Sequence, residues 1–267
     1  MMSKVIAVCN QKGGVGKTTT AIAMGAVLAE LGKKVLLIDV DDSGNPSLSI
    51  NLGTEEPERS LVGLMLTSYM DRDTTSLLEE TILHHEEGMD YIPAENRLGG
   101  ISEILSTSQD EAKKRTVLKR AIAPIRERYE YILLDAAPTL NMMSINLLTA
   151  ADEIIITTQP QGAAEDGIPA LVSSVAQVRQ SLNPDLCIKG LLITMLDRRT
   201  NYNKEKANTM ERAYSDLGMR VFSTRIPRAI TAESCMEQHQ SILKFDPKGK
   251  VAAAYRDFVN EYLSEEA

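Results

Sequence analysis

Short apolar runs recur along the chain and alternate with segments in which apolar residues repeat at helical spacing. Several runs are continuous in Val, Ile and Leu, which is typical of parallel strands buried on both faces. The runs predict strands at Val5–Asn10, Val35–Val40, Tyr91–Pro93, Tyr131–Asp135, Glu153–Thr158, Ile188–Met195 and Val221–Thr224. Helices are expected between them, at about residues 18–31, 111–128, 142–150, 163–182, 203–217 and 249–263.

This alternation predicts an α/β fold, with a doubly wound, mostly parallel sheet flanked by helices. Ligands of such folds bind at the carboxyl ends of the strands. Residues 43–85 are the least regular part and include an acidic, proline-bearing stretch at Thr54–Arg59, so we expect a surface insertion there. The sequence has no internal repeat or low-complexity linker, and its 267 residues are expected to form one domain.

The amino-acid composition narrows the kinds of protein that this chain can be. The 29 basic and 37 acidic residues give a net charge of −8, which argues against a protein coated in positive charge but allows a local basic patch. Cys9, Cys187 and Cys235 are far apart and predict no disulfide framework or metal centre. The first strand begins too early for a signal peptide, and no apolar stretch approaches the ~18–20 residues of a membrane span. We therefore expect a cytoplasmic protein.

The segment between the first strand and the first helix, Lys12–Thr19, reads KGGVGKTT. A strand, a glycine-rich turn and a helix start form a phosphate-binding loop, in which Lys17 reaches the β/γ-phosphates and Thr18 binds Mg²⁺. The usual first glycine of the motif is replaced by Gln11, but with background glycine near 7% a chance match to the stricter K-G-G-x-G-K-[ST] pattern is on the order of one in ten thousand. A flexible turn with solvated lysines is thus the weaker interpretation. The predicted nucleotide-binding residues are Lys12, Gly13, Gly14, Val15, Gly16, Lys17, Thr18 and Thr19.

Acidic residues follow two other predicted strands. Asp39 and Asp41 are two apart on the second strand, so both can face the phosphate loop, to orient the attacking water or to hold Mg²⁺. Asp135 ends the run Tyr131–Asp135 as the Walker-B aspartate does, which holds Mg²⁺ often through water. The alternative is that these acids open turns or cap helices. Beside the phosphate loop, we predict Asp41 as catalytic and Thr18, Asp39 and Asp135 as metal-binding.

These motifs together resemble those of the ParA/MinD ATPases, which carry a deviant Walker A loop, and most closely the small ParA/Soj-type partition proteins. The resemblance runs from residue 4 to about residue 263, and its first motif is the most specific. The segments that carry it are Asn10–Thr20, Val35–Asp41, Tyr129–Pro138, Ile145–Asp152, Met195–Asn201, Ile226–Arg228 and Phe245–Pro247.

The resemblance implies a single P-loop ATPase domain, residues 1–267, that hydrolyses ATP with Mg²⁺ and forms a homodimer around two bound ATP molecules. Lys12 corresponds to the family's signature lysine, which crosses to the partner's ATP, and Lys17 to the lysine of its own loop. Asp41 matches the family's hydrolytic aspartate and Asp135 its Walker-B aspartate. Met195 and Pro227 lie where the family packs adenine.

ATP-bound dimers of this family typically bind DNA without sequence preference, and a ParB-type partner stimulates hydrolysis and releases them. The resemblance thus predicts an ATP-dependent DNA partition ATPase, nucleoid-associated when ATP-bound. The otherwise acidic chain holds a basic cluster, which consists of Arg198, Arg199, Lys204, Lys206, Arg212, Arg220, Arg225 and Arg228. We predict that Arg199 and Arg228 of this cluster contact DNA. The alternative is a solvated helix surface, because Glu205 and Glu211 interrupt the cluster.

Three segments depart from the family pattern. The family's D-x-D-P-Q-G motif here reads DVDDSG, with Asp42 and Ser43 after the predicted catalytic aspartate. Residues 161–167 lack the family's aromatic residues, and residues 229–240 replace a basic, proline-bearing loop that helps to build the DNA-binding surface.

Other classes share the phosphate loop. A MinD-type membrane-cycling ATPase would end in a basic amphipathic helix, but Tyr255–Ala267 is acidic, so we expect no membrane partner. A nitrogenase-reductase-like protein or iron–sulfur carrier would need cysteines that bridge a cluster. A nucleotide-gated adaptor with weak hydrolysis stays open because of the altered Asp42-Ser43 pair.

Overall fold

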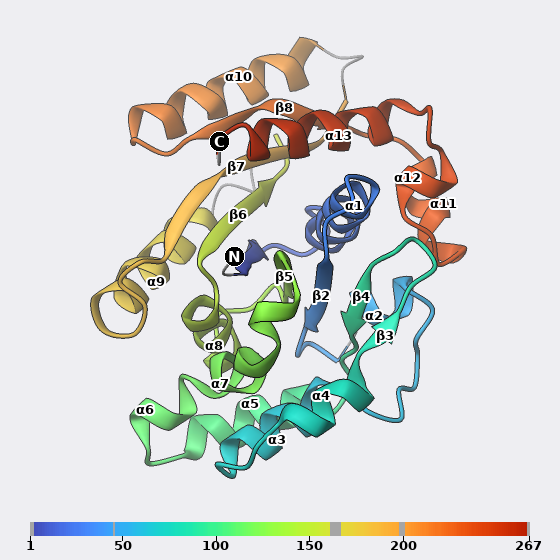
Figure 1. The fold of residues 1–267 in the computed structure, drawn as a ribbon. Helices are drawn as coiled ribbons and strands as arrows, with labels where there is room; N and C mark the ends of the chain where they lie inside the picture. Colours follow the sequence, from blue (N-terminus) through green and yellow to red (C-terminus); the bar gives the residue numbers. More distant parts are fainter. Residues whose placement is uncertain (1–2, 45, 161–166, 198–200, 266–267) are drawn as a thin grey trace.

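The computed structural model describes residues 3–44, 46–160, 167–197 and 201–265. These residues form an eight-stranded sheet in the order β3-β4-β2-β5-β1-β6-β7-β8 (Figure 1). Neighbouring strands are parallel, except for the antiparallel edge pair β3 and β4, so the predicted doubly wound sheet is confirmed. The strands are β1 (Lys4–Cys9), β2 (Val35–Val40), β3 (Leu83–His84), β4 (Asp90–Ile92), β5 (Tyr131–Ala136), β6 (Glu153–Thr158), β7 (Cys187–Leu196) and β8 (Val221–Pro227).

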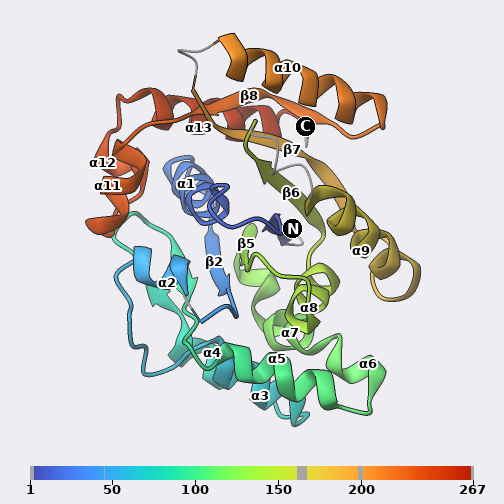
Figure 2. The ribbon, with the colours of Figure 1, turned by 180° about the vertical axis from the view of Figure 1, so that it is seen from behind.

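Helices cover both faces of the sheet, as the opposite views in Figures 1 and 2 show. One apolar core joins the sheet to α1, α2, α12 and α13, and the other joins it to α3, α5 and α7–α10. The helices are α1 (Lys17–Glu30), α2 (Ser47–Asn51), α3 (Leu61–Tyr69), α4 (Thr75–Thr81), α5 (Leu98–Thr107), α6 (Glu111–Lys114), α7 (Val117–Ile122), the 3₁₀ helix η1 (Ala123–Arg128), α8 (Met142–Ala150), α9 (Gly167–Ser181), α10 (Asn201–Asp216), α11 (Thr231–Glu237), α12 (Ile242–Phe245) and α13 (Lys250–Leu263).

Helix α1 is buried all round, because the sheet covers one side of it and α13 another. Every residue from Thr20 to Leu28 is buried. A helix that is apolar on all sides belongs in the interior of a protein, and each large side chain such as Met24 or Leu28 contributes about 1.5–3 kcal/mol through burial. The element that follows the phosphate loop is therefore firmly held.

The prediction of a surface insertion at residues 43–85 is wrong. This segment forms α2, α3, α4 and β3, and Leu61, Leu64 and Met65 of α3 are fully buried in the core. The predicted helix at 111–128 is also divided, into α6, α7 and η1, and Pro124 lies in the first turn of η1, where proline is tolerated. The short α5 and the pair α11 and α12 had no sequence prediction.

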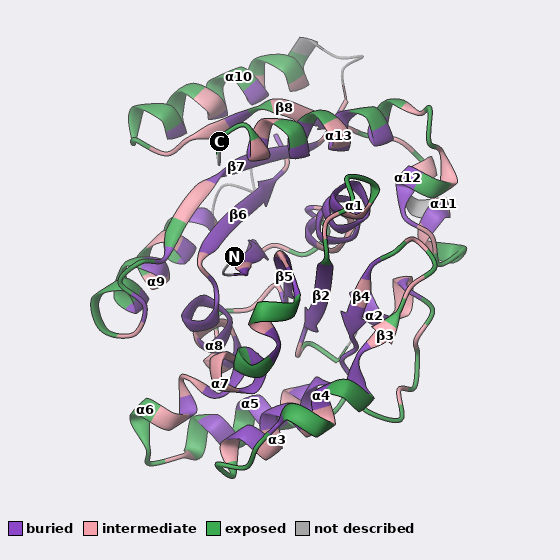
Figure 3. Cartoon of the chain, in the orientation of Figure 1, coloured by how far each residue is buried: buried purple, intermediate pink, exposed green. Residues whose placement is uncertain are grey.

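Strand β1 lies near the centre of the sheet, with β5 on one side and β6 on the other. The chain builds the β5 side first and the β6 side later, so the carboxyl end of β1 is a point at which the winding reverses. Ligands of doubly wound sheets bind at such a point. Figure 3 shows these central strands buried, while exposed residues gather on outer helices such as α6 and α10. Within the described residues, no helix is long and apolar enough to cross a bilayer.

Candidate functional site

The loop after β1 depends on glycines. Gly14 and Gly16 adopt φ angles of 70° and 81°, the left-handed region that side chains other than glycine rarely enter. Gly16 is also the N-cap of α1 and offers no side chain to the first-turn N–H groups. These N–H groups and the positive end of the helix dipole therefore face the space above the loop, where an anion binds favourably.

Side chains from neighbouring strands hold the loop in place. Asn10 Nδ2 donates to the Thr157 carbonyl over 2.7 Å, and Asn10 Oδ1 accepts from the Lys12 N–H over 3.0 Å. On the other side, Thr194 Oγ1 donates to the Val15 carbonyl over 2.8 Å. Bonds to β6 and β7 thus fix the loop from Asn10 to Val15 before any ligand binds.

Lys17 points back into the loop. Its side chain is buried, and its Nζ donates to the Lys12 carbonyl over 3.0 Å. Burial lowers the pKa of Lys17, while the nearby Asp135, Cys9 and Asp41 act in the opposite direction. The loop therefore encloses a cation that is poorly solvated and that would gain from a charged partner.

Asp135 lies on β5, opposite Val8 of β1 and Asp39 of β2. Both of its carboxylate oxygens are buried and lack a hydrogen-bond partner at ordinary geometry among the described residues. Burial and the neighbouring Asp39 raise its pKa well above the usual value, against the Thr18 hydroxyl and Lys17, which lower it. A buried carboxylate with unfilled acceptors beside a hydroxyl fits a hard cation such as Mg²⁺, which prefers oxygen ligands.

Asp39 has a different environment from Asp135. Its Oδ2 accepts from the Ser49 N–H and Oγ over 2.8 and 2.6 Å, and its Oδ1 accepts from the Asp41 N–H over 3.1 Å. Both oxygens thus hold the loop that leads from β2 into α2. We predicted Asp39 as a metal ligand, but its hydrogen bonds suit a loop anchor, and we do not assign a cation to it.

The environment of Asp39 gives a pH-dependent prediction. Burial raises its pKa from 3.8 to about 6, against the hydrogen bonds from Ser49 and Asp41. At a pH between these two pKa values, Asp39 holds a proton in the folded protein but not in the unfolded chain. The contribution of Asp39 to the free energy of unfolding is therefore present at pH 4 and is lost as the pH rises through 6. This contribution is about 3 kcal/mol. When the free energy of unfolding is measured by chemical denaturation from pH 4 to 7, Asp39→Asn should lack this part of the pH dependence.

The exposed Asp257→Asn is the matched control for Asp39→Asn and should follow the wild-type curve. Equal pH slopes for Asp39→Asn and the wild type would contradict the prediction. Because the Asp39 charge also raises the pKa of Asp135, the difference between the two curves contains the direct effect of Asp39 and its effect on Asp135.

Asp41 follows β2 at the same end of the sheet. Its side chain is buried, and its Oδ1 accepts from the Ser43 N–H over 2.9 Å and from the Ser43 hydroxyl. Asp41 contributes to the electrostatic environment of both Lys17 and Asp135. The structure therefore brings together Lys17, Asp41 and Asp135, which come from three separate parts of the sequence.

A cleft of about 350 Å³ opens beside the loop. Gly16 and Thr19 border it on the loop side, and Met195 and Pro227, the predicted adenine contacts, line it as well. Met195 has a φ of 50°, a left-handed conformation that is rare for a side chain of this size. Asn51 of α2 also lines the cleft. Sequence reasoning missed Asn51 because it gave no helix in this segment.

Of the two predicted DNA contacts, the structure describes only Arg228. Arg199 lies outside the described residues, and Arg228 is exposed at the rim of the same cleft. Elsewhere in the basic cluster, Arg225 pairs with Glu211, and Arg220 pairs with acidic residues of the C-terminal segment. Part of the positive charge of the cluster is therefore neutralised within the chain.

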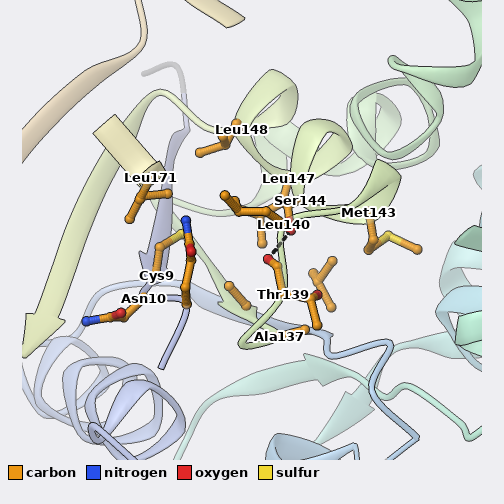
Figure 4. A pocket seen from close by; sticks show the side chains of 13 residues that line it. Cys9, Asn10, Ala137, Thr139, Leu140, Met143, Ser144, Leu147, Leu148 and Leu171 are labelled. Carbon is orange, nitrogen blue, oxygen red and sulfur yellow. Dashed lines mark hydrogen bonds between the residues drawn. The ribbon is translucent and has the colours of Figure 1, made fainter. Parts of the chain in front are cut away.

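A small apolar cavity of about 20 Å³ lies between the end of β1 and α8 (Figure 4). Cys9, Leu147 and Leu171 are among the residues that line it. Burial raises the pKa of the Cys9 thiol to about 12, so the thiol stays protonated and acts as a packing residue. Ser144 and Thr139 also line this cavity, and Ser144 Oγ donates to the Thr139 carbonyl over 2.6 Å.

Comparison with known proteins identifies the family. A family profile described as an AAA domain matches residues 3–188. The sporulation initiation inhibitor protein Soj of Bacillus subtilis is 35% identical over 261 residues, which cover 97% of this chain and 98% of Soj. The chromosome partitioning protein ParA of Caulobacter vibrioides is 33% identical, and the match covers 98% of this chain and 95% of ParA. The chain belongs to the ParA/MinD family.

Solved structures share the fold of this chain. A structure of cobyrinic acid a,c-diamide synthase from Mycobacterium smegmatis, with bound ADP and magnesium, is 30% identical with a TM-score of 0.81 and covers 99% of this chain and 96% of that one. The Pyrococcus horikoshii septum site-determining protein MinD, complexed with Mg-ADP, shares the fold at 22% identity and a TM-score of 0.72. The match covers 97% of this chain and 96% of MinD. The matches to Soj and ParA over nearly the full chain confirm the predicted resemblance to ParA/Soj proteins.

Proposed function

We propose that this protein is a Mg²⁺-dependent ATPase whose active site is the loop Lys12–Thr19. The observation that carries the proposal is that Lys17 of the loop and Asp135 of β5 are both buried and lie close enough to affect each other's pKa, while the Asp135 oxygens lack a hydrogen bond of ordinary geometry. ATP would lie with its phosphates on the loop, where Lys17 and the α1 N–H groups bind them. Met195 and Pro227 would pack on the adenine ring.

The remaining residues divide the chemistry between them. Thr18 and Asp135 would hold Mg²⁺, which supplies positive charge to the phosphates when it is bound. Asp41 would orient the water that attacks the γ-phosphate. Lys12 is half-exposed, so its ammonium can extend to the ATP of a second subunit and stabilise charge that develops on the transferred group.

We further infer that this ATPase acts in DNA partition. The similarity to Soj and ParA extends over nearly the full length of both chains, as expected for a shared mechanism. In this proposal ATP binding assembles a homodimer, the dimer binds DNA without sequence preference, and a ParB-like partner stimulates hydrolysis. Such a protein is cytoplasmic and associates with the nucleoid in its ATP-bound state.

Measurement of mass in solution tests the proposal. With ATP and Mg²⁺ the protein should double in mass, and the dimer should bind random-sequence duplex DNA. Because the binding depends on phosphate contacts, the DNA affinity should fall at least about tenfold between 50 and 200 mM salt. Arg228→Glu should weaken the binding, whereas Lys34→Glu, an exposed charge change after α1, is the matched control.

Other results would point to other functions. Salt-insensitive or absent DNA binding by an ATP-bound dimer would contradict the partition role and leave the ATPase intact. Dimerisation without hydrolysis, with DNA and a partner present, would indicate a nucleotide-gated adaptor. ATP-dependent sedimentation with anionic vesicles would indicate a membrane-cycling protein.

A further inference from the structure

We propose that Asp42 is a positioning residue that couples the Asp41 segment to the loop after Asp135. The inference rests on the proposed ATPase function, in which these two aspartates act on the water and on Mg²⁺. The inference starts from the two hydrogen bonds that the Asp42 side chain accepts from residues of that loop.

The Asp42 carboxylate reaches across the site to the loop between β5 and α8. Its Oδ2 accepts from Asn141 Nδ2 over 2.7 Å, and its Oδ1 accepts from Thr139 Oγ1 over 3.4 Å. The bond to Asn141 is short and charge-assisted, which places it among the stronger hydrogen bonds in proteins. Two contacts from one carboxylate fix both the distance and the orientation of the loop.

The loop is held equally firmly on its other side. Asn141 is the N-cap of α8, and its Oδ1 accepts from the Met143 and Ser144 N–H groups over 3.0 and 3.2 Å. Ser144 Oγ in turn donates to the Thr139 carbonyl, as Figure 4 shows. The amide of Asn141 therefore joins Asp42 to the start of a helix, so a movement of one is transmitted to the other.

The Asp42 backbone is also confined. A Cβ added to Gly99 of α5 would come within 3.1 Å of the Asp42 carbonyl oxygen, so α5 packs closely on this residue. Asp41 directly precedes Asp42, and Asp135 is four residues before Thr139. The Asp42 contacts therefore set the separation between the two catalytic segments. Asp42 and Asn141 do not belong to the phosphate loop and do not line the cleft beside it, so we expect an effect on kcat with little effect on ATP binding.

An exchange of the two side chains tests the coupling. Asn141→Asp faces two carboxylates against each other and should lower kcat at least about tenfold, and Asp42→Ala should lower it several-fold. The double variant Asp42→Asn/Asn141→Asp restores an amide–carboxylate pair in the opposite direction and should recover most of the wild-type kcat. Aspartate caps helices as well as asparagine does, so α8 keeps its N-cap in every Asn141→Asp variant. The dissociation constant of ATP should stay within about twofold in all of them.

Amide hydrogen exchange gives a second readout that needs no hydrolysis. With a non-hydrolysable ATP analogue, the peptides that cover residues 41–44 and 136–144 should gain protection together in the wild type and in the double variant. In Asp42→Ala the protection should be confined to one of them.

The outcomes separate the two proposals. A wild-type protein that neither binds nor hydrolyses ATP would contradict the proposed function. A wild type that hydrolyses ATP, with unchanged kcat and exchange in Asp42→Ala and no rescue in the double variant, would contradict the coupling alone. Loss of ATP binding in Asn141→Asp would indicate a merely structural role and would also overturn the inference.

Discussion

Replacement of Lys17 by alanine is expected to lower the affinity for ATP at least about 100-fold. Lys17 is buried in the loop, and its ammonium would exchange the Lys12 carbonyl for phosphate oxygens. Removal of one partner of a buried, hydrogen-bonded charge pair costs about 2–5 kcal/mol. Isothermal titration with ATP and Mg²⁺ measures the loss directly.

The variant needs a folding control, because Lys17 is also a cation close to the buried Asp135. Without Lys17, the Asp135 carboxylate is less well compensated, so Lys17→Ala should also melt at a lower temperature. The double variant Lys17→Ala/Asp135→Asn removes both charges and should recover part of the stability without recovering ATP affinity. Lys34→Ala removes an exposed lysine and should change neither quantity. Retention of ATP affinity in folded Lys17→Ala would mean that the site lies elsewhere.

Replacement of Asp41 by alanine is expected to separate binding from hydrolysis. The variant should bind ATP and dimerise, while kcat falls at least about 100-fold, because a positioned base or water-orienting group contributes about 10²–10⁴-fold. The dimer should then persist long after ATP is added. Single-turnover hydrolysis, followed together with the mass of the complex, measures both effects.

Two further variants define the Asp41 prediction. Ser43→Ala removes a hydroxyl that donates to Asp41 Oδ1 but keeps the carboxylate, so its effect on kcat should be smaller. Asp185→Ala, an exposed aspartate before β7, should leave hydrolysis unchanged. Hydrolysis by Asp41→Ala at the wild-type rate would move the water-orienting role to another residue.

The central strands could be predicted because their signal is local. β1, β2, β5 and β6 are buried along their whole lengths, or nearly so, and a strand that is buried on both faces must be apolar throughout. The phosphate loop was equally evident, since Gly14 and Gly16 adopt backbone angles that few other residues tolerate. Both features depend on residues adjacent in the chain.

The short elements could not be predicted in the same way. Helices α2, α4 and α12 have seven residues or fewer, which is too short for an isolated helix in water or for a periodic pattern. Contacts with the rest of the protein stabilise them. Helix α2, for example, is anchored by the bond from Ser49 to Asp39, and it brings Asn51 to the edge of the cleft.

The sequence by itself determined the family, the parallel sheet and the position of the phosphate loop, because each follows from neighbouring residues. It placed Asp39 and Asp135 in one class, as acids at strand ends. Only the tertiary structure separated them, since Ser49 and the Asp41 N–H fill the acceptors of Asp39, whereas those of Asp135 lack a hydrogen bond of ordinary geometry among the described residues. The pair of Asp42 and Asn141, 99 positions apart, was equally hidden. Such contacts form only when the order β2-β5-β1 brings distant strand ends together, and no local pattern records that order.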